Sequence, residues 1–233
     1  ADACEKLLAL IKGKNADCIV CGLKQTSGNI WAPAFDKDYS DLASFKCDFI
    51  YWINTELLSS SVNKIYKRGL ITELYPENMS FGEDLVFVLN YLKHCNRISF
   101  TQEPLYQHEV YNSVSLTHSF SPARFSNLED IQKAILDFAD DKNKINPRIY
   151  DKYVKDALHL TRMWYKNKNV PYIRKKEIIG EWLKQSYIRK LKISDYQLHW
   201  KDRMLLHSLH MSCFIGINWI VNGKEYINSL SKE

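Results

Sequence analysis

The residues of this chain whose types could do chemistry gather in a short stretch that ends at Asp84. Ser80 and Glu83 stand three residues apart just before an apolar run, which is the spacing of a capping box that opens a helix. Asp84 is then placed in the first turn, where the positive end of the helix dipole favours an ionised carboxylate. A charged and rigidly held carboxylate can act as a general base. The simpler interpretation is an ordinary helix cap with one extra acid.

The elements that position this stretch are predicted from the spacing of apolar residues. After Asp84 they recur at i, i+3, i+4 and i+7, which predicts a helix with one buried face. Before it, the sequence predicts a helix over 2–11 that ends at Gly13, a buried strand over 17–23, a loop or ragged hairpin over 24–40, and a short helix that begins after Ser40 and Asp41. After it come extended segments over 97–101 and 104–108.

From residue 119 onward the sequence predicts helices only. Helix starts are indicated by Ser121-Pro122, Asn146-Pro147, Val170-Pro171 and Ser194-Asp195, and an apolar stretch over 213–221 completes the series. We therefore expect a mixed α/β part over 1–118 and a mainly α-helical domain over 119–233. More than two strands beyond residue 120 would contradict this prediction.

The composition is that of an ordinary globular protein. Of 233 residues, 45% are apolar and 25% are charged, and the net charge of +5 permits contact with phosphates or anionic lipids without requiring it. The six cysteines are scattered, which favours a reducing cytoplasm over a disulfide framework. Cys18 and Cys21 have C-x-x-C spacing, but on one buried strand their side chains point to opposite faces, so a shared metal is not expected.

An ordered set of short motifs resembles a known family. The set begins with Asn63-Lys64-Ile65-Tyr66, continues through Pro76-Glu77 and Gly82-Glu83-Asp84, and ends with Glu103-Pro104-Leu105-Tyr106 and Asn112-Ser113-Val114-Ser115. In this order and at this spacing the segments resemble family 2 glycosyltransferases of the GT-A fold. They are most similar to the bacterial enzymes that build capsule, lipopolysaccharide and other surface glycans. Each motif alone is unspecific, but the ordered set is specific.

The resemblance implies roles for five residues. Asp84 matches the catalytic base of an inverting sugar transfer, while Glu83, Lys64, Asn63 and His108 match positions close to bound substrate. Considered without the family, Lys64 is equally well explained as a solvated lysine, and His108 as a surface histidine at a strand end.

The resemblance also implies a donor and a metal. In similar enzymes a nucleotide-binding half ends in an acidic D-x-D motif, which holds a divalent cation, Mn or Mg, against the diphosphate of the sugar nucleotide. The resemblance here covers residues 1–118 and matches only the acceptor-side half. We therefore expect the metal ligands upstream of Ala1, and expect this chain alone to bind sugar nucleotides poorly and to be inactive. Asp36-Lys37-Asp38 has the letters of the motif but follows the predicted strand instead of preceding the helix.

Two classes of function remain open. The resemblance implies a glycosyltransferase of hexosyltransferase type, which transfers a sugar from a nucleotide-sugar donor to a glycan or lipid-linked acceptor in surface polysaccharide biosynthesis. The alternative is a noncatalytic helical module that keeps the acceptor-side fold in order to bind a glycan or a protein.

The predicted helical tail mixes basic and aromatic side chains. Such a mixture suits an anionic membrane surface, whereas the simpler interpretation is a solvated helix with its aromatics in the core. Nucleic acid is not an expected partner, and the expected location is the cytoplasm, with peripheral contact at the inner face of the membrane. The residues concerned are Arg174, Lys175, Lys176, Lys184, Arg189, Lys190 and Lys192, interleaved with Tyr172, Trp182 and Tyr187.

Overall fold

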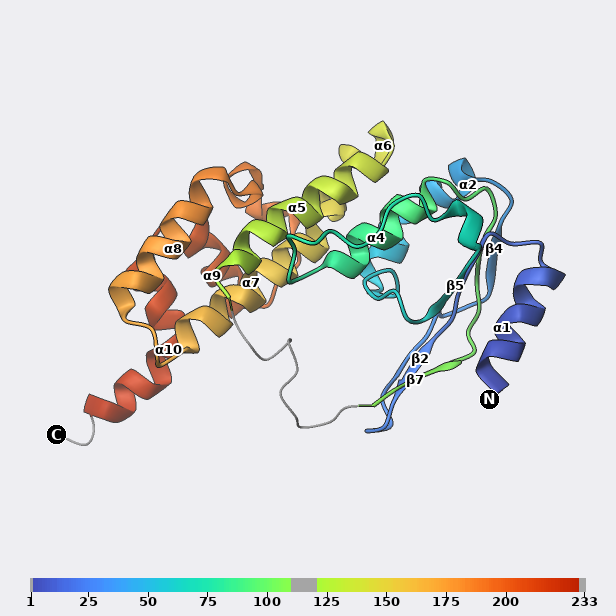
Figure 1. Cartoon of the computed structure of the whole chain (residues 1–233). Helices are drawn as coiled ribbons and strands as arrows, with labels where there is room; N and C mark the ends of the chain where they lie inside the picture. The colour runs from blue at the N-terminus through green and yellow to red at the C-terminus, as the bar shows by residue number, and fades with distance from the viewer. Residues whose placement is uncertain (1, 110–120, 231–233) are drawn as a thin grey trace. The chain divides into compact units, whose positions relative to one another are not determined.

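The computed structural model describes residues 2–109 and 121–230 and divides the chain into two compact units. Unit 1 comprises Ala1–Leu116 and Lys133–Ile149, and unit 2 comprises Thr117–Gln132 and Tyr150–Glu233. Unit 1 contains both strands and helices, whereas the described residues of unit 2 contain helices and turns (Figure 1). The predicted motif over 112–115 lies outside the described residues.

Two small sheets form the strand layer of unit 1. The first sheet has the order β4-β6-β1-β5, in which β1 is parallel to β6 and antiparallel to β5. The second has the order β3-β2-β7, in which β2 is antiparallel to β3 and parallel to β7. The strands are β1 (Cys18–Val20), β2 (Leu23–Gln25), β3 (Ile30–Trp31), β4 (Lys37–Tyr39), β5 (Lys64–Tyr66), β6 (Ile98–Phe100) and β7 (Tyr106–His108).

The single strand predicted over 17–23 is wrong, because the chain passes from one sheet to the other at Gly22. Strand β1 ends at Val20, and Leu23 already pairs with Trp31 in the second sheet. A Cβ atom on Gly22 would lie 2.6 Å from the Cβ of Ala32, so only glycine allows the two backbones to approach this closely. The hairpin expected within 24–40 is confirmed by the pairing of β2 with β3.

Aromatic residues fill the core on which these strands pack. Trp52 stacks on Phe100 with ring centroids 3.6 Å apart, and Phe45 lies between Phe100 and Phe138 at 6.1 and 6.0 Å. The Tyr39 hydroxyl accepts a hydrogen bond from Trp52 Nε1 at 2.6 Å. The helices of unit 1 are α1 (Asp2–Gly13), α2 (Leu42–Cys47), α3 (Phe49–Asn54), α4 (Glu83–Leu92) and α6 (Asp141–Lys144), with a 3₁₀ turn over Arg68–Leu70.

The capping box predicted from Ser80 and Glu83 is not formed. Helix α4 begins at Glu83 because the chain takes a left-handed turn at its N-cap, Gly82, where φ is 76° and no side chain caps the helix. Ser80 therefore precedes the helix, and Glu83 occupies the first helical position instead of the third. The apolar stripe is confirmed, since its four residues are buried: Leu85, Val88, Leu89 and Leu92.

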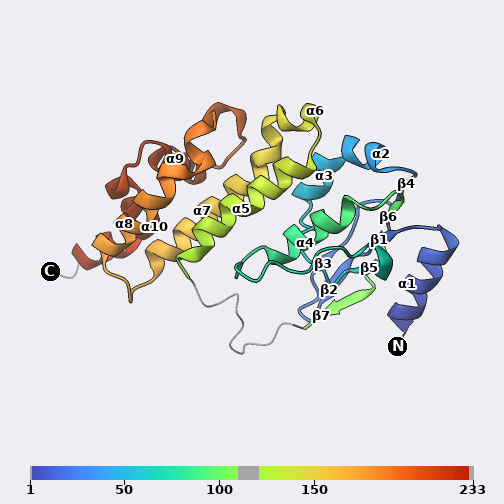
Figure 2. The ribbon, with the colours of Figure 1, turned by 45° about the horizontal axis from the view of Figure 1, so that its top comes forward.

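Unit 2 is a helical body. Helix α10 packs against α7 and α9, and α7 also packs against α8 (Figure 2). The residues of 121–230 form no strand, which confirms the predicted mixed α/β class with a helical C-terminal region. No helix within the described part of the chain is long and apolar enough to cross a membrane. The helices are α5 (Ala123–Phe138, which begins in unit 2), α7 (Asp151–Lys166), α8 (Tyr172–Gln185), α9 (Trp200–His210) and α10 (Phe214–Leu230).

Two predicted helix starts in this region need correction. Asn146-Pro147 opens a 3₁₀ turn over Pro147–Tyr150, and α7 begins only after it. The dipeptide at 194–195 lies in another 3₁₀ turn, Ile193–Asp195, and α9 begins later, at Trp200. The N-cap of α9 is His199, whose Nδ1 accepts a hydrogen bond from the backbone of Lys201 at 3.4 Å. The imidazole of His199 therefore caps this helix, instead of the predicted Ser194.

The core of unit 2 contains a half-buried carboxylate, Glu129. It accepts hydrogen bonds from the hydroxyl of Tyr153 at 2.5 Å, from Trp182 Nε1 at 2.7 Å and from the backbone N–H of Tyr187 at 3.2 Å. Burial raises the pKa of the Glu129 carboxyl, which the three donors oppose. These contacts tie α5, α7 and α8 together within the unit.

Candidate functional site

Asp84 lies in the first turn of α4 and is half-buried. Its Oδ1 atom accepts a hydrogen bond from the hydroxyl of Ser61 at 2.7 Å. The start of a helix stabilises a negative charge, and a donated hydrogen bond fixes one carboxylate oxygen while the other stays available. This is the arrangement that a general base needs, so the structure supports the geometry expected for Asp84, while its catalytic role stays a prediction.

Ser61 belongs to a loop over residues 55–62 that a buried asparagine holds in place. The Nδ2 atom of Asn63 donates to the carbonyl oxygen of Cys21 at 2.8 Å and to that of Leu57 at 3.3 Å. The backbone carbonyl oxygen of Asn63 accepts a hydrogen bond from the backbone N–H of Cys21 at 2.9 Å. Asn63 is fully buried and therefore joins the end of β1 to the 55–62 loop from inside the protein.

Lys64 continues this network and is not the solvated lysine that the sequence allowed as an alternative. Its ammonium group donates to the carbonyl oxygen of Leu57 at 2.7 Å, to Asn63 Oδ1 at 2.8 Å and to the carbonyl oxygen of Ser60. Three donors thus meet three acceptors of the protein itself. In this arrangement Lys64 positions the loop, and a direct contact with substrate requires one of these bonds to exchange.

The environment of Lys64 affects its protonation. Burial lowers the pKa of the ammonium group to about 8, although the thiols of Cys18 and Cys21 and the carboxylate of Asp84 act in the opposite direction. Lys64 is therefore close to half-protonated at mildly alkaline pH. Because the ammonium holds the loop that carries Ser61, its protonation is linked to the geometry around Asp84.

A cavity of about 270 Å³ opens beside the 55–62 loop. Its walls come from that loop and from β2, β3 and β7, and they include Trp31, Ser60 and His108. Trp31 is 43% exposed, so its ring is available for stacking. Ser60 lines the cavity, and the next residue, Ser61, holds Asp84. The cavity and the carboxylate are therefore connected through neighbouring residues of one loop.

The remaining predicted site residues fall in different surroundings. His108 is exposed and lines the cavity, which agrees with its expected place near substrate and leaves its role untested. Glu83 is half-buried at the first position of α4, beside Asp84. Of the five residues, the structure brings Asn63, Lys64 and Asp84 together through the 55–62 loop.

Sequence reasoning missed the contributions of Ser60, Ser61 and Trp31. The serine run before Asn63 is typical of a break between elements. Trp31 lies in the 24–40 stretch, whose composition is typical of a loop. A further signal is hidden from the sequence, since Glu56 has a left-handed backbone with φ of 64° in the wall of the cavity. A non-glycine residue in this conformation is uncommon and often accompanies functional loops.

The described residues do not supply a divalent-cation site. Within 2–109 and 121–223 no three His, Cys, Asp or Glu side chains converge as metal ligands. Asp36 accepts a hydrogen bond from the backbone N–H of Gln102 at 2.7 Å, and Asp38 forms an ion pair with Lys14 at 2.7 Å. These residues do not fit the expected cation, so no chemistry is assigned to a metal on this chain.

The basic tail divides between core and surface. Lys175 is buried and donates to the carbonyl oxygen of Tyr165 at 2.7 Å, and Trp182 is buried against Glu129. Arg174 is exposed and pairs with Glu177 at 3.0 Å. The interleaved pattern therefore does not form one continuous basic and aromatic face, and membrane contact stays a prediction.

Comparison with known proteins adds information on the fold. No family model and no curated protein sequence gives a significant match to this chain. Among solved structures, residues 1–349 of the S. aureus glycosyltransferase TarS in complex with UDP-GlcNAc match with a TM-score of 0.63 and 17% identity, covering 97% of this chain. A second structure of the 1–349 fragment matches with a TM-score of 0.59 and 16% identity over 95% of this chain, and a longer TarS structure with 0.57 and 17% over 94%.

The match is partial with respect to the neighbours. This chain spans 64% and 62% of the two 1–349 structures and 37% of the longer one. At this level of identity the likeness concerns the fold. The chain therefore has a mixed α/β fold shared with a bacterial glycosyltransferase, and this agrees in general terms with the resemblance seen in its motifs.

Proposed function

We propose that this chain is part of an inverting glycosyltransferase in which Asp84 is the general base. The observation that carries the proposal is the carboxylate of Asp84, held by Ser61 at the start of α4 and joined through Ser60 to the wall of a cavity. The family resemblance of the surrounding motifs and the fold shared with TarS support the same assignment.

The proposed reaction needs a nucleotide-sugar donor and a glycan or lipid-linked acceptor. The acceptor hydroxyl attacks the anomeric carbon of the donor sugar from the face opposite the diphosphate, and its proton passes to Asp84. The bond between that carbon and the diphosphate oxygen breaks, and its electron pair leaves with the diphosphate. UDP-GlcNAc is the nucleotide sugar bound to TarS and is the first donor to test.

Within this proposal the other residues position substrate and base. The ring of Trp31 and the imidazole of His108, both in the cavity wall, offer a stacking face and a hydrogen-bonding group to a sugar. Asn63 and Lys64 act through the 55–62 loop. Glu83 lies beside Asp84 in the first turn of α4. A divalent cation and its ligands are proposed for the intact enzyme, outside this chain.

The proposal also includes the product and the cellular location that the resemblance implies. The product is expected to be a bacterial surface polysaccharide, such as capsule or lipopolysaccharide. Synthesis from nucleotide sugars places the protein in the cytoplasm, with peripheral contact at the inner face of the membrane. These points depend on the family resemblance, and fractionation of cells that express the complete protein tests the location directly.

The direct test is Asp84→Asn in the complete protein that carries this chain. Asparagine keeps an oxygen that can accept from Ser61 but cannot take up the acceptor proton. We expect turnover to fall by about 10²–10⁴-fold, while donor binding stays close to wild type. Release of UDP from UDP-GlcNAc and other UDP-sugars, with surface polysaccharide precursors as acceptors, measures the effect.

Asp141→Asn is the matched control, because Asp141 also lies in the first turn of a helix but is fully exposed. It should retain wild-type turnover. If Asp84→Asn is as active as this control on a true acceptor, another residue is the base and the proposal fails. A protein that binds the glycan without any transfer supports the noncatalytic alternative.

A further inference from the structure

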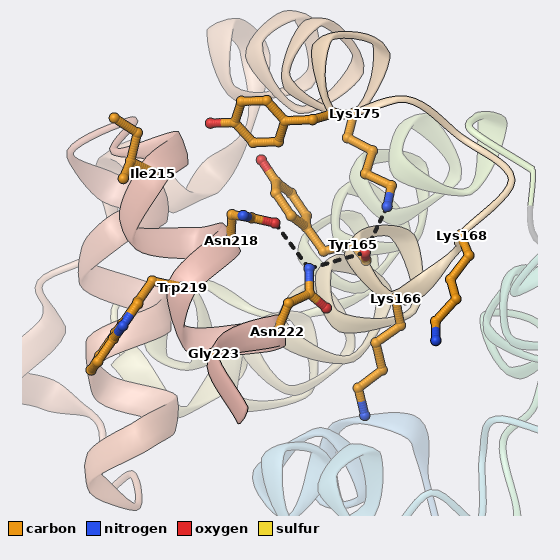
Figure 3. Close-up of a pocket in the computed structure, with 10 residues that line it drawn as sticks. Tyr165, Lys166, Lys168, Lys175, Ile215, Asn218, Trp219, Asn222 and Gly223 are labelled. Atoms are coloured by element: carbon orange, nitrogen blue, oxygen red, sulfur yellow. Dashed lines mark hydrogen bonds between the residues drawn. The ribbon is translucent and has the colours of Figure 1, made fainter. Parts of the chain in front are cut away.

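A second cavity, of about 610 Å³, lies in unit 2 between the end of α7, the start of α8 and helix α10. We call it the α7–α10 pocket. Figure 3 shows Tyr165, Asn218 and Asn222 at its centre. Lys166 and Lys168 lie on one side, and Ile215 and Trp219 lie on the other. Neither the motifs of the sequence nor the proposed reaction assigns it a role.

The centre of the pocket is polar and incompletely hydrogen-bonded. The Nδ2 atom of Asn222 donates to the carbonyl oxygen of Tyr165 at 3.3 Å and to Asn218 Oδ1 at 2.9 Å, which fixes the orientation of both amides. Within residues 121–223, the amide nitrogen of Asn218 and the amide oxygen of Asn222 are thereby left for other partners. One donor and one acceptor thus remain on two neighbouring side chains.

Tyr165 provides a third group of this kind. The residue is 1% exposed, and its hydroxyl has no hydrogen-bond partner in the described part of the chain. A buried hydroxyl without a partner is unfavourable, and a ligand or water in the pocket can remove that cost. The pocket centre therefore presents the mixed donors and acceptors that carbohydrate hydroxyls match.

The rim supplies the two other features of a ligand site. Trp219 is 55% exposed and Tyr172 is 40% exposed, so aromatic faces are open to the solvent at the pocket. Lys166 and Lys168 are exposed on the side away from Trp219. Of the described residues that line the pocket, three are lysines and none is acidic. An aromatic face suits the apolar face of a sugar ring, and the lysines suit a phosphate.

We propose that the α7–α10 pocket binds a phosphate-bearing carbohydrate, with the sugar ring against Trp219, its hydroxyls at Tyr165, Asn218 and Asn222, and the phosphate toward Lys166. This site uses no residue of the cavity beside the 55–62 loop. If the proposed function is correct, the pocket holds a stretch of anionic glycan substrate. The binding itself does not depend on that function.

Calorimetric titration of the chain tests the class of ligand. The probes are glucose 6-phosphate and a phosphorylated maltodextrin, compared with glucose, inorganic phosphate, UMP and phosphatidylglycerol vesicles. We expect the two sugar phosphates to bind at least ~10-fold more tightly than glucose or phosphate alone, because both the stacking and the charge contribute. Tighter binding of UMP or of the vesicles overturns the carbohydrate assignment.

Matched substitutions locate the site. Trp219→Ala should raise the Kd for glucose 6-phosphate by about 3–10-fold, whereas Trp200→Ala, which removes an equally exposed tryptophan from α9, should leave it unchanged. Lys166→Gln should raise the Kd by a similar factor at low salt and by less at 0.5 M NaCl. Lys192→Gln is its control. Equal effects in each pair overturn the assignment.

Tyr165→Phe separates ligand binding from folding. It removes only the hydroxyl that lacks a partner, so the Tm should stay at or above that of the wild type. The Kd for glucose 6-phosphate should nevertheless rise by about 2–10-fold. An unchanged Kd overturns the role of this hydroxyl. Asp84→Asn should bind the sugar phosphate like the wild type, so failure of the catalytic proposal and failure of this one are distinguishable.

Discussion

The cavity beside the 55–62 loop and the α7–α10 pocket differ in how completely their polar groups are hydrogen-bonded. In the first, the amide of Asn63 and the ammonium of Lys64 are buried and bonded to protein oxygens, and the wall is held from within. In the second, the hydroxyl of Tyr165 is buried without a partner among the described residues, beside an incompletely bonded pair of amides.

The difference indicates what each region is suited for. A satisfied buried network fixes geometry, and fixed geometry is what a catalytic carboxylate such as Asp84 needs. Unsatisfied groups around an open cavity gain hydrogen bonds only when something binds there. Substitutions in the first region should therefore affect folding and turnover together, whereas those in the second should affect binding alone.

The largest effect is expected from Asn63→Ala. The substitution leaves the buried carbonyl oxygen of Cys21 without its amide donor, leaves that of Leu57 with Lys64 as its donor, and removes one acceptor of Lys64. We expect the free energy of unfolding to fall by ~3 kcal/mol, since each buried polar group left without a partner costs about 1–3 kcal/mol. Urea denaturation measures it.

Asn96→Ala is the control for this prediction, because Asn96 is exposed in the same unit. It should change the stability by less than ~0.5 kcal/mol. A similar small loss for Asn63→Ala would show that the network beside the 55–62 loop is not what holds the wall, and the contrast between the two regions would fail.

The second prediction concerns the pH dependence that Lys64 causes. Its pKa is lowered by burial from 10.5 to about 8, so the unfolded chain binds more protons than the folded one between these values. Stability contributed by this group must therefore increase as pH rises through about 8. Relative to Lys64→Met, the wild type should gain ~2 kcal/mol between pH 7 and pH 9.5.

Comparison with the Met variant is essential, because burial raises the pKa of the Cys18 thiol to about 12, which makes the folded state less stable at alkaline pH. That contribution is present in both proteins and largely cancels. Thermal or urea unfolding at the two pH values gives the difference. A difference that does not vary with pH would mean that the buried ammonium keeps its ordinary pKa.

The smallest effect is expected from Ser61→Ala, which removes the hydrogen bond to Asp84. Turnover should fall by about 3–10-fold, and stability by less than ~1 kcal/mol. Ser59→Ala is the control, since that hydroxyl donates to Glu56 instead. Equal turnover for the two variants would exclude a positioning role for Ser61.

Much of the secondary structure follows from local patterns. The helix at the N-terminus, the helix start after Asp41 and the apolar stripe of α4 were predictable because the periodicity and the capping residues are local in sequence. Asp41 accepts a hydrogen bond from the backbone of Ser44 at 2.7 Å, as a capping residue should. The division at residue 118 stays a prediction.

One error occurs where two segments of the chain pass close together, and the other at a glycine with a left-handed backbone. The strand over 17–23 is split because Gly22 must pass close to Ala32, and the start of α4 is set by the backbone of Gly82 instead of the side chain of Ser80. Both features depend on conformation and close approach. Local propensity does not contain that information.

By itself the sequence determined the mixed class, the helical tail and the candidate carboxylate, because apolar spacing and an ordered set of motifs are written along the chain. Only the tertiary structure decided that Lys64 is buried, that Ser61 holds Asp84, and that the hydroxyl of Tyr165 has no hydrogen-bond partner among the described residues. The physical reason is that burial and hydrogen-bond partners come from residues far apart in the sequence. Ser61 and Asp84 are separated by 23 positions, and Tyr165 and Asn222 by 57.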